Sequence, residues 1–444
     1  MPPPLSAPPA SAKPFGFWIC FALVVGNMIG SGIFLLPASL APYGMNSVWG
    51  WLFTATGALL LAYVFAALSR SLPHAGGPYV FTKLAFGPLA GFMIAWGYWV
   101  SVWVGCAAIA SGSVSYLLRL FPQVDASLAP VVTLAILWTL TIINCLGVKM
   151  AGVVQLVTTG LKLLPLIAIA GFAMVRLGAG EFPALPTVPF KLDSVTAAAT
   201  LTLWALLGFE SATVPADRVQ NAAVVLPRAI LIGTLLTAIV YVIACTAVQL
   251  MIPAAQLAQS NAPFADVARL WWGDSAAWWL TLFVVISGVG CLNGWILVQA
   301  EMPRAMALNG AFPAIFARHS RFDTPVFGLV FTSILVTALV LANYSKTMVE
   351  VFTFMILIST SATLIVYLVC SLAAIRLAWR GEMGTGALRF RVLVAAALLG
   401  AIYSLWTLTG AGGEAVSWSF ALMLAGLPVY LYTPFRRYVA SRTN

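Results

Sequence analysis

The stretch Gly26-Asn27-Met28-Ile29-Gly30-Ser31-Gly32-Ile33-Phe34 lies inside an apolar run that is long enough to cross a lipid bilayer. Its glycines weaken a helix, since Gly is about 1 kcal/mol less favourable than Ala in a helix interior. One interpretation is close helix packing, which small residues at this spacing permit. The other is a helix that unwinds at mid-membrane, whose free N–H groups bind a carboxylate and whose carbonyls bind a cation. The glycine pattern alone does not decide between them.

The composition of the 444-residue chain is that of a membrane protein. Hydrophobic residues make up 62% of it and charged residues only 8%, with a mean hydropathy of +1.00. A soluble domain carries about 25% charged residues, so a soluble enzyme and a disordered protein are excluded. The net charge of +10 does not indicate nucleic acid as a partner, because the basic residues stand singly between apolar runs and form no cluster on one face. The expected surroundings are a lipid bilayer.

Apolar runs of spanning length recur along the whole chain. A bilayer core about 30 Å thick needs about 20 apolar residues per helix. Runs of this size between charged or Pro/Gly-rich breaks give twelve predicted spans, at 16–40, 48–68, 88–116, 128–147, 152–174, 195–214, 229–251, 276–300, 326–343, 350–374, 391–409 and 416–434. The connections are short. The sequence therefore predicts an all-α integral membrane protein with twelve transmembrane helices.

Basic residues set the predicted orientation. With the N-terminus inside, sixteen of the 22 Lys and Arg residues lie on the inner side, five on the outer side, and Lys162 within a span. This bias follows the positive-inside rule, so both termini are predicted to be cytoplasmic. Residues 1–14 are expected to form a flexible cytoplasmic tail and 436–444 a second tail, on either side of a single domain at 15–435.

Two charged side chains fall at bilayer depth, Lys162 in the fifth span and Glu210 in the sixth. Such a charge costs several kcal/mol unless it is paired or hydrated, so each is a candidate functional residue. The Lys162 ammonium needs hydrogen-bond acceptors, which the carbonyl groups of a broken helix would supply. This holds whether Lys162 couples transport to an ion or only caps the end of a neighbouring helix. Four roles are open to the Glu210 carboxylate: it could latch a gate, attract a cationic substrate, carry a proton or make a structural hydrogen bond. Glu301, Arg304 and Asp217 lie at inner helix ends, where a solvated or salt-bridged role is expected.

The sixth span repeats the pattern of the first. Leu203-Trp204-Ala205-Leu206-Leu207-Gly208-Phe209-Glu210 also places a glycine and a charge at mid-membrane. Interrupted helices at the first and sixth positions are expected of an inverted five-plus-five repeat of the LeuT type. This favours unwound segments in both spans. The predicted repeats are 16–174 and 195–374, and the last two helices, within 391–434, are peripheral.

No metal ion or cofactor is indicated by the sequence. The six cysteines fall inside apolar stretches without the spacing of a disulfide framework or a metal site, and are interpreted as buried small side chains. His74 and His319 lie in polar connecting segments far apart in the chain.

From about Phe15 to Tyr432, the sequence resembles the amino acid-polyamine-organocation superfamily, and within it the bacterial basic amino acid/polyamine antiporters. The most specific matches are the 26–34 stretch with its continuation to Pro37, Gly76-Gly77-Pro78-Tyr79, Thr202-Leu203-Trp204 with Gly208 and Glu210-Ser211-Ala212, and Asn293-Gly294-Trp295. Four motifs in this order on these spans form a specific signal.

The resemblance implies roles for individual residues. Binding of the substrate's carboxylate and amino group would fall to the unwound first helix, at Ile29, Gly30, Ser31 and Gly32. The remaining implied substrate contacts are the two tryptophans Trp204 and Trp295 and the tenth-span Ser359. An inner gate of two tyrosines around a glutamate would consist of Tyr98, Tyr367 and Glu210.

Three positions depart from the arginine/agmatine antiporter. Cys106 stands where that antiporter has an Asn that helps to hold the guanidinium, and Ala205 stands at the place of a substrate-binding Ser. Both changes remove hydrogen bonds that a buried guanidinium needs. Lys162 instead resembles permeases of the same superfamily in which a fifth-helix Lys occupies the place of a sodium ion. This implies sodium independence, with Lys162 either a fixed charge or a proton carrier.

The leading hypothesis is a sodium-independent secondary transporter of amino acids or polyamines that works by alternating access as an antiporter. The alternative is a proton-coupled amino acid symporter. A channel would need charged or carbonyl rings along a pore, and a membrane enzyme would need a nucleophile and base, neither of which the sequence indicates. The expected location is the bacterial inner membrane. Close relatives of the antiporter form dimers, so a homodimer is an expectation of the resemblance alone.

Overall fold

The computed structural model describes residues 15–179, 188–260, 262–342, 348–384 and 386–432, and the two predicted tails lie outside these ranges. Within them the chain is helical, and its only β-type pairing is an isolated parallel bridge between Phe15 and Val219. The α-helices are α1 (Phe17–Met28), α2 (Gly32–Leu40), α3 (Asn46–Ser71), α4 (Pro78–Phe86), α5 (Pro88–Leu120), α6 (Ala129–Cys145), α7 (Val148–Gly178), α8 (Leu192–Leu206), α9 (Ala222–Met251), α10 (Ala254–Leu257), α11 (Pro263–Trp272), α12 (Asp274–Leu308), α13 (Val326–Ala342), α14 (Met348–Trp379), α15 (Ala387–Thr409) and α16 (Gly413–Leu424). Short 3-10 turns are η1 (Ala41–Tyr43), η2 (Ala126–Leu128), η3 (Ser211–Thr213), η4 (Ala216–Arg218) and η5 (Ala314–Ala317).

Nine helical segments of the described chain are long and apolar enough to cross a bilayer, at 17–43, 46–71, 88–120, 152–176, 222–251, 274–308, 353–379, 387–409 and 413–432. Three shorter apolar helices, at 129–145, 192–206 and 326–342, coincide with the other three predicted spans. The sequence did not predict the short helices α4, α10 and α11, which lie in connections between spans.

Both interruptions that the glycines indicated are present. In the first span α1 ends at Met28 and α2 begins at Gly32, so residues 29–31 leave the helix. In the sixth span α8 ends at Leu206, and only the single turns η3 and η4 follow before α9. Gly208 has a φ of +115°, a conformation that side chains rarely adopt.

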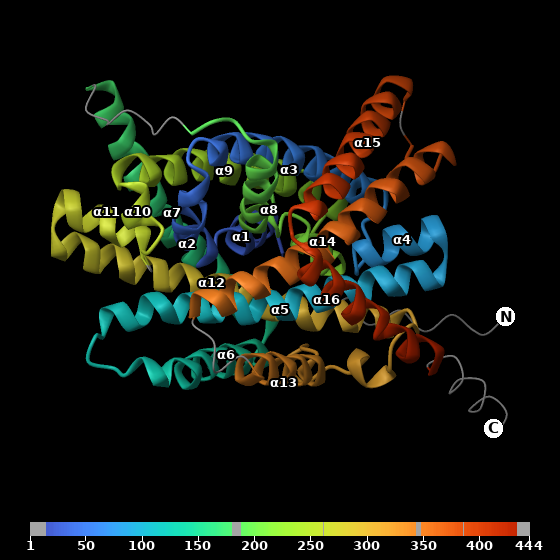
Figure 1. The fold of residues 1–444 in the computed structure, drawn as a ribbon. Coiled ribbons are helices and arrows are strands. Elements are labelled where there is room, and N and C mark those ends of the chain that lie inside the picture. The colour runs from blue at the N-terminus through green and yellow to red at the C-terminus, as the bar shows by residue number, and fades with distance from the viewer. Residues whose placement is uncertain (1–14, 180–187, 261, 343–347, 385, 433–444) are drawn as a thin grey trace, which may run out of the picture.

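The interrupted helices lie in the interior of the helix bundle. Figure 1 shows α1, α2 and α8 between the long helices α5 and α12 on one side and α3 and α9 on the other, while α6 and α13 lie together beyond α5. Helix α15 packs on α3 and α14, away from the interrupted helices α1 and α2. Both breaks therefore face other helices, as irregular backbone inside a membrane must.

The Gly76-Gly77 pair permits a close backbone approach to the end of the sixth span. The N–H of Gly76 donates to the carbonyl of Val214 at 2.8 Å. A Cβ on Gly77, whose φ is +33°, would lie 2.1 Å from Oγ1 of Thr213. No larger residue fits at this position without moving the backbone. The motif thus docks the connection before α4 onto η3.

Candidate functional site

The last three carbonyl groups of α1 each accept a hydrogen bond from a side chain of another helix. The pairs are Lys162 Nζ with Gly26 O at 2.7 Å, Trp295 Nε1 with Asn27 O at 3.0 Å, and the Tyr241 hydroxyl with Met28 O at 2.8 Å. A helix normally ends with carbonyls that need outside partners. Here α7, α12 and α9 supply those partners, so the broken end of α1 is anchored from three sides. Tyr241 was not predicted from the sequence.

Residues around the α1–α2 break are held by α5 and α12. The hydroxyl of Ser31 donates to the carbonyl of Ile109 on α5 at 3.0 Å. The thiol of Cys291 donates to the carbonyl of Asn27 at 3.2 Å, and a Cβ on Gly30 would come within 2.9 Å of that sulfur. The first N–H groups of α2 lack acceptors within the helix and form its positive end. This end can receive a carboxylate.

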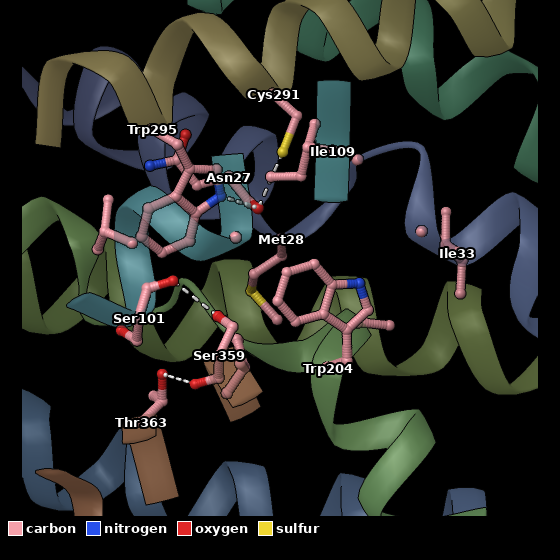
Figure 2. Close-up of a pocket in the computed structure, with 16 residues that line it drawn as sticks. Asn27, Met28, Ile33, Ser101, Ile109, Trp204, Cys291, Trp295, Ser359 and Thr363 are labelled. Carbon is pink, nitrogen blue, oxygen red and sulfur yellow. Dashed lines mark hydrogen bonds between the residues drawn. The ribbon is translucent and has the colours of Figure 1, made fainter. Parts of the chain in front are cut away.

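A cavity of about 30 Å³ lies beside the two breaks. Its walls come from the first, third, sixth, eighth and tenth predicted spans, and are formed by Asn27, Met28, Gly30, Gly32, Ile33, Ser101, Val102, Gly105, Ile109, Trp204, Ala205, Leu207, Cys291, Trp295, Ser359 and Thr363 (Figure 2). This volume holds about two water molecules. An amino acid would enter only if the walls moved apart.

Two tryptophans project onto this cavity from α8 and α12, as Figure 2 shows. Trp204 lies near Gly105, where a Cβ would come within 3.3 Å of the indole. Trp295 lies near Gly208, where a Cβ would come within 3.1 Å of its ring and within 3.2 Å of the Asn27 carbonyl carbon. Because Gly208 has no side chain, the sixth-span break can pack closely against Trp295 and against the backbone at the end of α1.

Three hydroxyl side chains form the polar part of the wall. Ser359 donates to the carbonyl of Ser101 at 2.8 Å and Thr363 to the carbonyl of Ser359 at 2.9 Å (Figure 2). The hydroxyl of Ser101 donates to the carbonyl of Tyr98 at 2.7 Å. Since each proton is already donated to the backbone, each oxygen retains lone pairs. Such oxygens accept hydrogen bonds from a substrate N–H group.

The predicted substrate-binding residues fall into two groups. Gly30, Gly32, Trp204, Ala205, Trp295 and Ser359 line the cavity. Ile29, Ser31 and Cys106 are buried and lie outside its wall. Within the described residues no group of three or more His, Cys, Asp or Glu side chains is arranged to hold a metal ion.

Glu210 and the two tyrosines predicted as a gate lie together, next to the cavity but outside its wall. The Tyr98 hydroxyl donates to Oε1 of Glu210 at 3.0 Å, and the Tyr367 hydroxyl to Oε2 at 2.5 Å. The N–H of Gly208 also donates to Oε2, at 3.2 Å. Phe209 stacks on the ring of Tyr367, and all of these side chains are buried. The carboxylate thus ties α5 and α14 to the sixth-span break.

A second polar cluster lies beyond Glu210 along the sixth span, among α12, η4 and the segment after η5. It is a ring of ion pairs and hydrogen bonds. Arg218 pairs with Glu301 at 3.0 Å and with Asp323 at 2.7 Å. Arg304 contacts Glu301 at 2.8 Å, Asp217 at 3.3 Å and His319 at 3.1 Å, and His319 contacts Asp323 at 3.1 Å. We call it the ion ring. Glu301 is 1% exposed, so of the two expected roles it has the salt-bridged one and not the solvated one.

The ion ring is connected to the first span. The N–H of Phe15, just before α1, donates to the carbonyl of Arg218 at 3.2 Å, and the N–H of Gln220 donates back to the carbonyl of Phe15 at 2.9 Å. Sequence reasoning missed this connection because its members are far apart in the chain. The local signals were the i, i+3 spacing of Glu301 and Arg304 and the i, i+4 spacing of His319 and Asp323.

Comparison with known proteins identifies the class that this fold and site define. A model of the amino acid permease family matches residues 15–432. The chain belongs to this family and is a multi-pass membrane protein. The family resemblance stated from the motifs is thereby confirmed.

Three similar proteins are antiporters or polyamine transporters by name. The cadaverine/lysine antiporter of Escherichia coli (strain K12) is 33% identical over 335 residues, which are 75% of this chain and 75% of the relative. A Bacillus subtilis (strain 168) protein provisionally named an arginine/ornithine antiporter is 32% identical over 404 residues, 83% of this chain and 86% of its own. The putrescine transporter PotE of Haemophilus influenzae is 29% identical over 421 residues, 93% and 95% of the two chains.

Proposed function

We propose that this protein is a sodium-independent antiporter that exchanges amino acids or polyamines across a bacterial inner membrane by alternating access. The observation that carries the proposal is the cavity between two interrupted helices, closed by Trp204, Trp295 and the Glu210 contacts. The names of the relatives favour cationic amino acids and diamines as substrates. The chemistry is binding and release, without covalent change, so the protein is no enzyme under this proposal.

The proposed architecture is a single transporter domain at 15–435 with twelve spans. Its repeats are 16–174 and 195–374, related by an inverted five-plus-five symmetry, and the helices within 391–434 are peripheral. The matching positions of the two helix interruptions support this arrangement. Both termini are proposed to be cytoplasmic, on the side that carries the excess of Lys and Arg.

In the proposed binding mode, the substrate carboxylate lies at the start of α2 and its amino group at the end of α1. Gly30 and Gly32 line the cavity at this point, and the positive end of α2 favours an anion. A cationic side chain would extend past Trp204, where an indole face attracts a cation, toward Ser359. Ile29, Ser31 and Cys106 would act by shaping the walls, since they lie behind them.

We propose two closures on the cytoplasmic side. The inner one is the Glu210 carboxylate with Tyr98 and Tyr367, and the outer one is the ion ring. Both join the sixth span to α5, α12 or α14, so both must open for release into the cytoplasm. With both formed, the cavity is closed on that side.

Sodium independence is supported by the hydrogen bonds that the last carbonyl groups of α1 already accept. Carbonyls at a broken helix end are the usual ligands of a coupling sodium ion. The carbonyls of Gly26, Asn27 and Met28 accept hydrogen bonds from Lys162, Trp295 and Tyr241 instead. The Lys162 ammonium supplies a positive charge at this end of the helix without a bound ion.

Proton symport is the second candidate, and one observation favours it. Lys162 is 0% exposed and forms no ion pair with any described residue, with the Gly26 carbonyl as its hydrogen-bond acceptor. A buried ammonium without a counter-charge is costly. An ammonium that loses its proton during the cycle would couple transport to a proton gradient.

The test of the proposed function is exchange by purified protein in sodium-free liposomes. Vesicles loaded with each unlabelled compound would be offered the labelled forms of lysine, cadaverine, ornithine, putrescine, arginine, agmatine, alanine and leucine. Uptake of an amino acid or an amine that saturates and is lost in Trp204→Ala supports the proposal. Steady ion current without saturable uptake would indicate a channel and contradict it.

A further inference from the structure

A separate pocket lies where α3 ends and α15 begins, far along the chain from the transport cavity. It measures about 70 Å³ and is lined by Tyr63, Ala66, Ala67, Arg70, Ser71, Leu231, Met383, Gly384, Arg389 and Leu393. The Ser71 hydroxyl donates to the carbonyl of Met383 at 3.2 Å and so closes one edge. In the proposed orientation this pocket faces the cytoplasmic surface of the membrane.

Two arginines in this pocket have no anionic partner in the described part of the chain. Neither Arg70 nor Arg389 forms an ion pair there, and both are exposed. The acidic residue nearest in sequence, Glu382, is paired with Arg380 at 3.9 Å. Leu231 of α9 also lines the pocket, and Arg228 precedes it by three residues on the same helix.

The position of Arg389 adds to the need for an anion. It is the third residue of α15, where the free N–H groups of a helix already create a positive end. A basic residue there is unfavourable unless a negative group lies close by. Phosphate groups bind well at such a helix end, and here Arg70 and Arg389 line the same pocket.

The remaining walls define the rest of the ligand. Tyr63, Ala66, Ala67, Leu231 and Leu393 are apolar or aromatic and belong to the membrane-spanning parts of α3, α9 and α15. A free phosphate ion would leave these walls unused. A ligand with a phosphate group joined to hydrocarbon uses both parts of the pocket.

We propose that this pocket binds an anionic phospholipid of the cytoplasmic leaflet, with its phosphate at Arg70 and Arg389 and its chains along α3 and α15. Basic pockets between helices on the cytoplasmic side are suited to such headgroups. The lipid would hold the peripheral helix α15 against α3, where Gly57 lies against Tyr403 and Gly400 against Leu61. Lipid binding at this pocket rests on the proposed orientation, with both termini in the cytoplasm, and is a property separate from substrate exchange.

The test is native mass spectrometry of lipid binding, which does not depend on transport. The full-length protein would be placed in phosphatidylcholine nanodiscs with graded phosphatidylglycerol, and compared with the double variant Arg70→Gln/Arg389→Gln. The control Arg318→Gln/Arg321→Gln removes the same charge from exposed sites on the same predicted side. Each arginine is expected to contribute about fivefold, so the double variant should retain phosphatidylglycerol about 25-fold less well than wild type and control.

Equal retention by all three proteins would overturn the proposal. A second arm adds inorganic phosphate to lipid-free detergent samples and, separately, to the nanodiscs that contain phosphatidylglycerol. Phosphate that binds wild type and not the double variant, and that displaces phosphatidylglycerol at equal concentration, would identify a soluble anion as the ligand and also contradict the proposal. If the double variant Arg70→Gln/Arg389→Gln and the control variant have the same melting temperature, weaker lipid binding by the double variant does not result from unfolding.

Discussion

The Lys162 ammonium donates a 2.7 Å hydrogen bond to the main-chain carbonyl of Gly26, deep in the membrane-spanning region. The two residues are 136 positions apart, and the bond joins α7 to the broken end of α1. Trp295 and Tyr241 make the same type of contact one and two residues further along α1, with the carbonyls of Asn27 and Met28. The end of α1 is therefore fixed by side chains in places where a sodium-coupled transporter would use an ion.

Replacing Lys162 with Ala should abolish most exchange. The Gly26 carbonyl would be left buried without a donor, which costs about 1–3 kcal/mol, and the positive charge would be lost. We expect the initial exchange rate in sodium-free liposomes to fall by about tenfold or more. The control Lys191→Ala, in an exposed segment before α8, should leave the rate unchanged. An active Lys162→Ala protein would contradict the assigned role.

Replacing Tyr367 with Phe should weaken the inner closure. The variant keeps the stacking on Phe209 and removes only the 2.5 Å hydrogen bond to Glu210. A hydrogen bond to a charged group contributes about 1.5–3 kcal/mol, so the open state should become more populated. We expect faster loss of labelled substrate from loaded liposomes into substrate-free medium. Tyr430→Phe, in the last helical segment, is the control, and an unchanged leak in Tyr367→Phe would exclude a gating role for the bond.

Breaking the ion ring at Arg218 should lower the stability of the protein. Glu301 is almost fully buried and would keep only Arg304 as a partner. Removal of one partner from a buried ion pair costs about 3–5 kcal/mol, so Arg218→Ala should melt earlier in detergent. The double variant Arg218→Met/Glu301→Leu removes both charges and should recover part of the loss. A double variant no more stable than Arg218→Ala would mean that the lost stability does not come from the broken Arg218–Glu301 pair.

The backbone at Gly208 should tolerate no side chain. Its φ is +115°, and a Cβ would meet Trp295 and the backbone of Asn27 and Met28 at 3.1–3.2 Å. Gly208→Ala should therefore lose exchange activity even where the protein is still inserted. The control Gly160→Ala changes a helical glycine with no atom within 4 Å of the added Cβ. Equal activity of both variants would show that the two breaks need not approach each other.

The positions of the spans along the chain were predictable from the sequence because each span is a local feature, an apolar run between breaks. The interruption near Gly30 was predictable for the same reason, since glycines and a mid-membrane charge recur in the sixth span. The grouping of Tyr98 and Tyr367 around Glu210 came from the family resemblance, because apolar periodicity does not reveal which of many aromatic residues meet.

Contacts between distant segments could not be predicted. Arg218 and Glu301 are charged residues at helix ends, and such residues are usually solvated, so nothing local distinguishes a buried pair. Tyr241 is one aromatic residue in an apolar helix, and its bond to Met28 depends on how α9 packs on α1. The hydroxyl of Ser31 donates to the carbonyl of Ile109, 78 positions further along the chain, and this contact depends on how α5 packs beside the first-span break.

The central claim is exchange, and one comparison tests it most directly. Uptake of labelled lysine or putrescine would be measured in sodium-free liposomes that are either empty or loaded with unlabelled substrate, each with and without an imposed proton gradient. We predict uptake that requires internal substrate and is independent of the gradient. Gradient-driven uptake into empty liposomes, lost in Lys162→Ala, would contradict the antiporter account and identify a proton symporter.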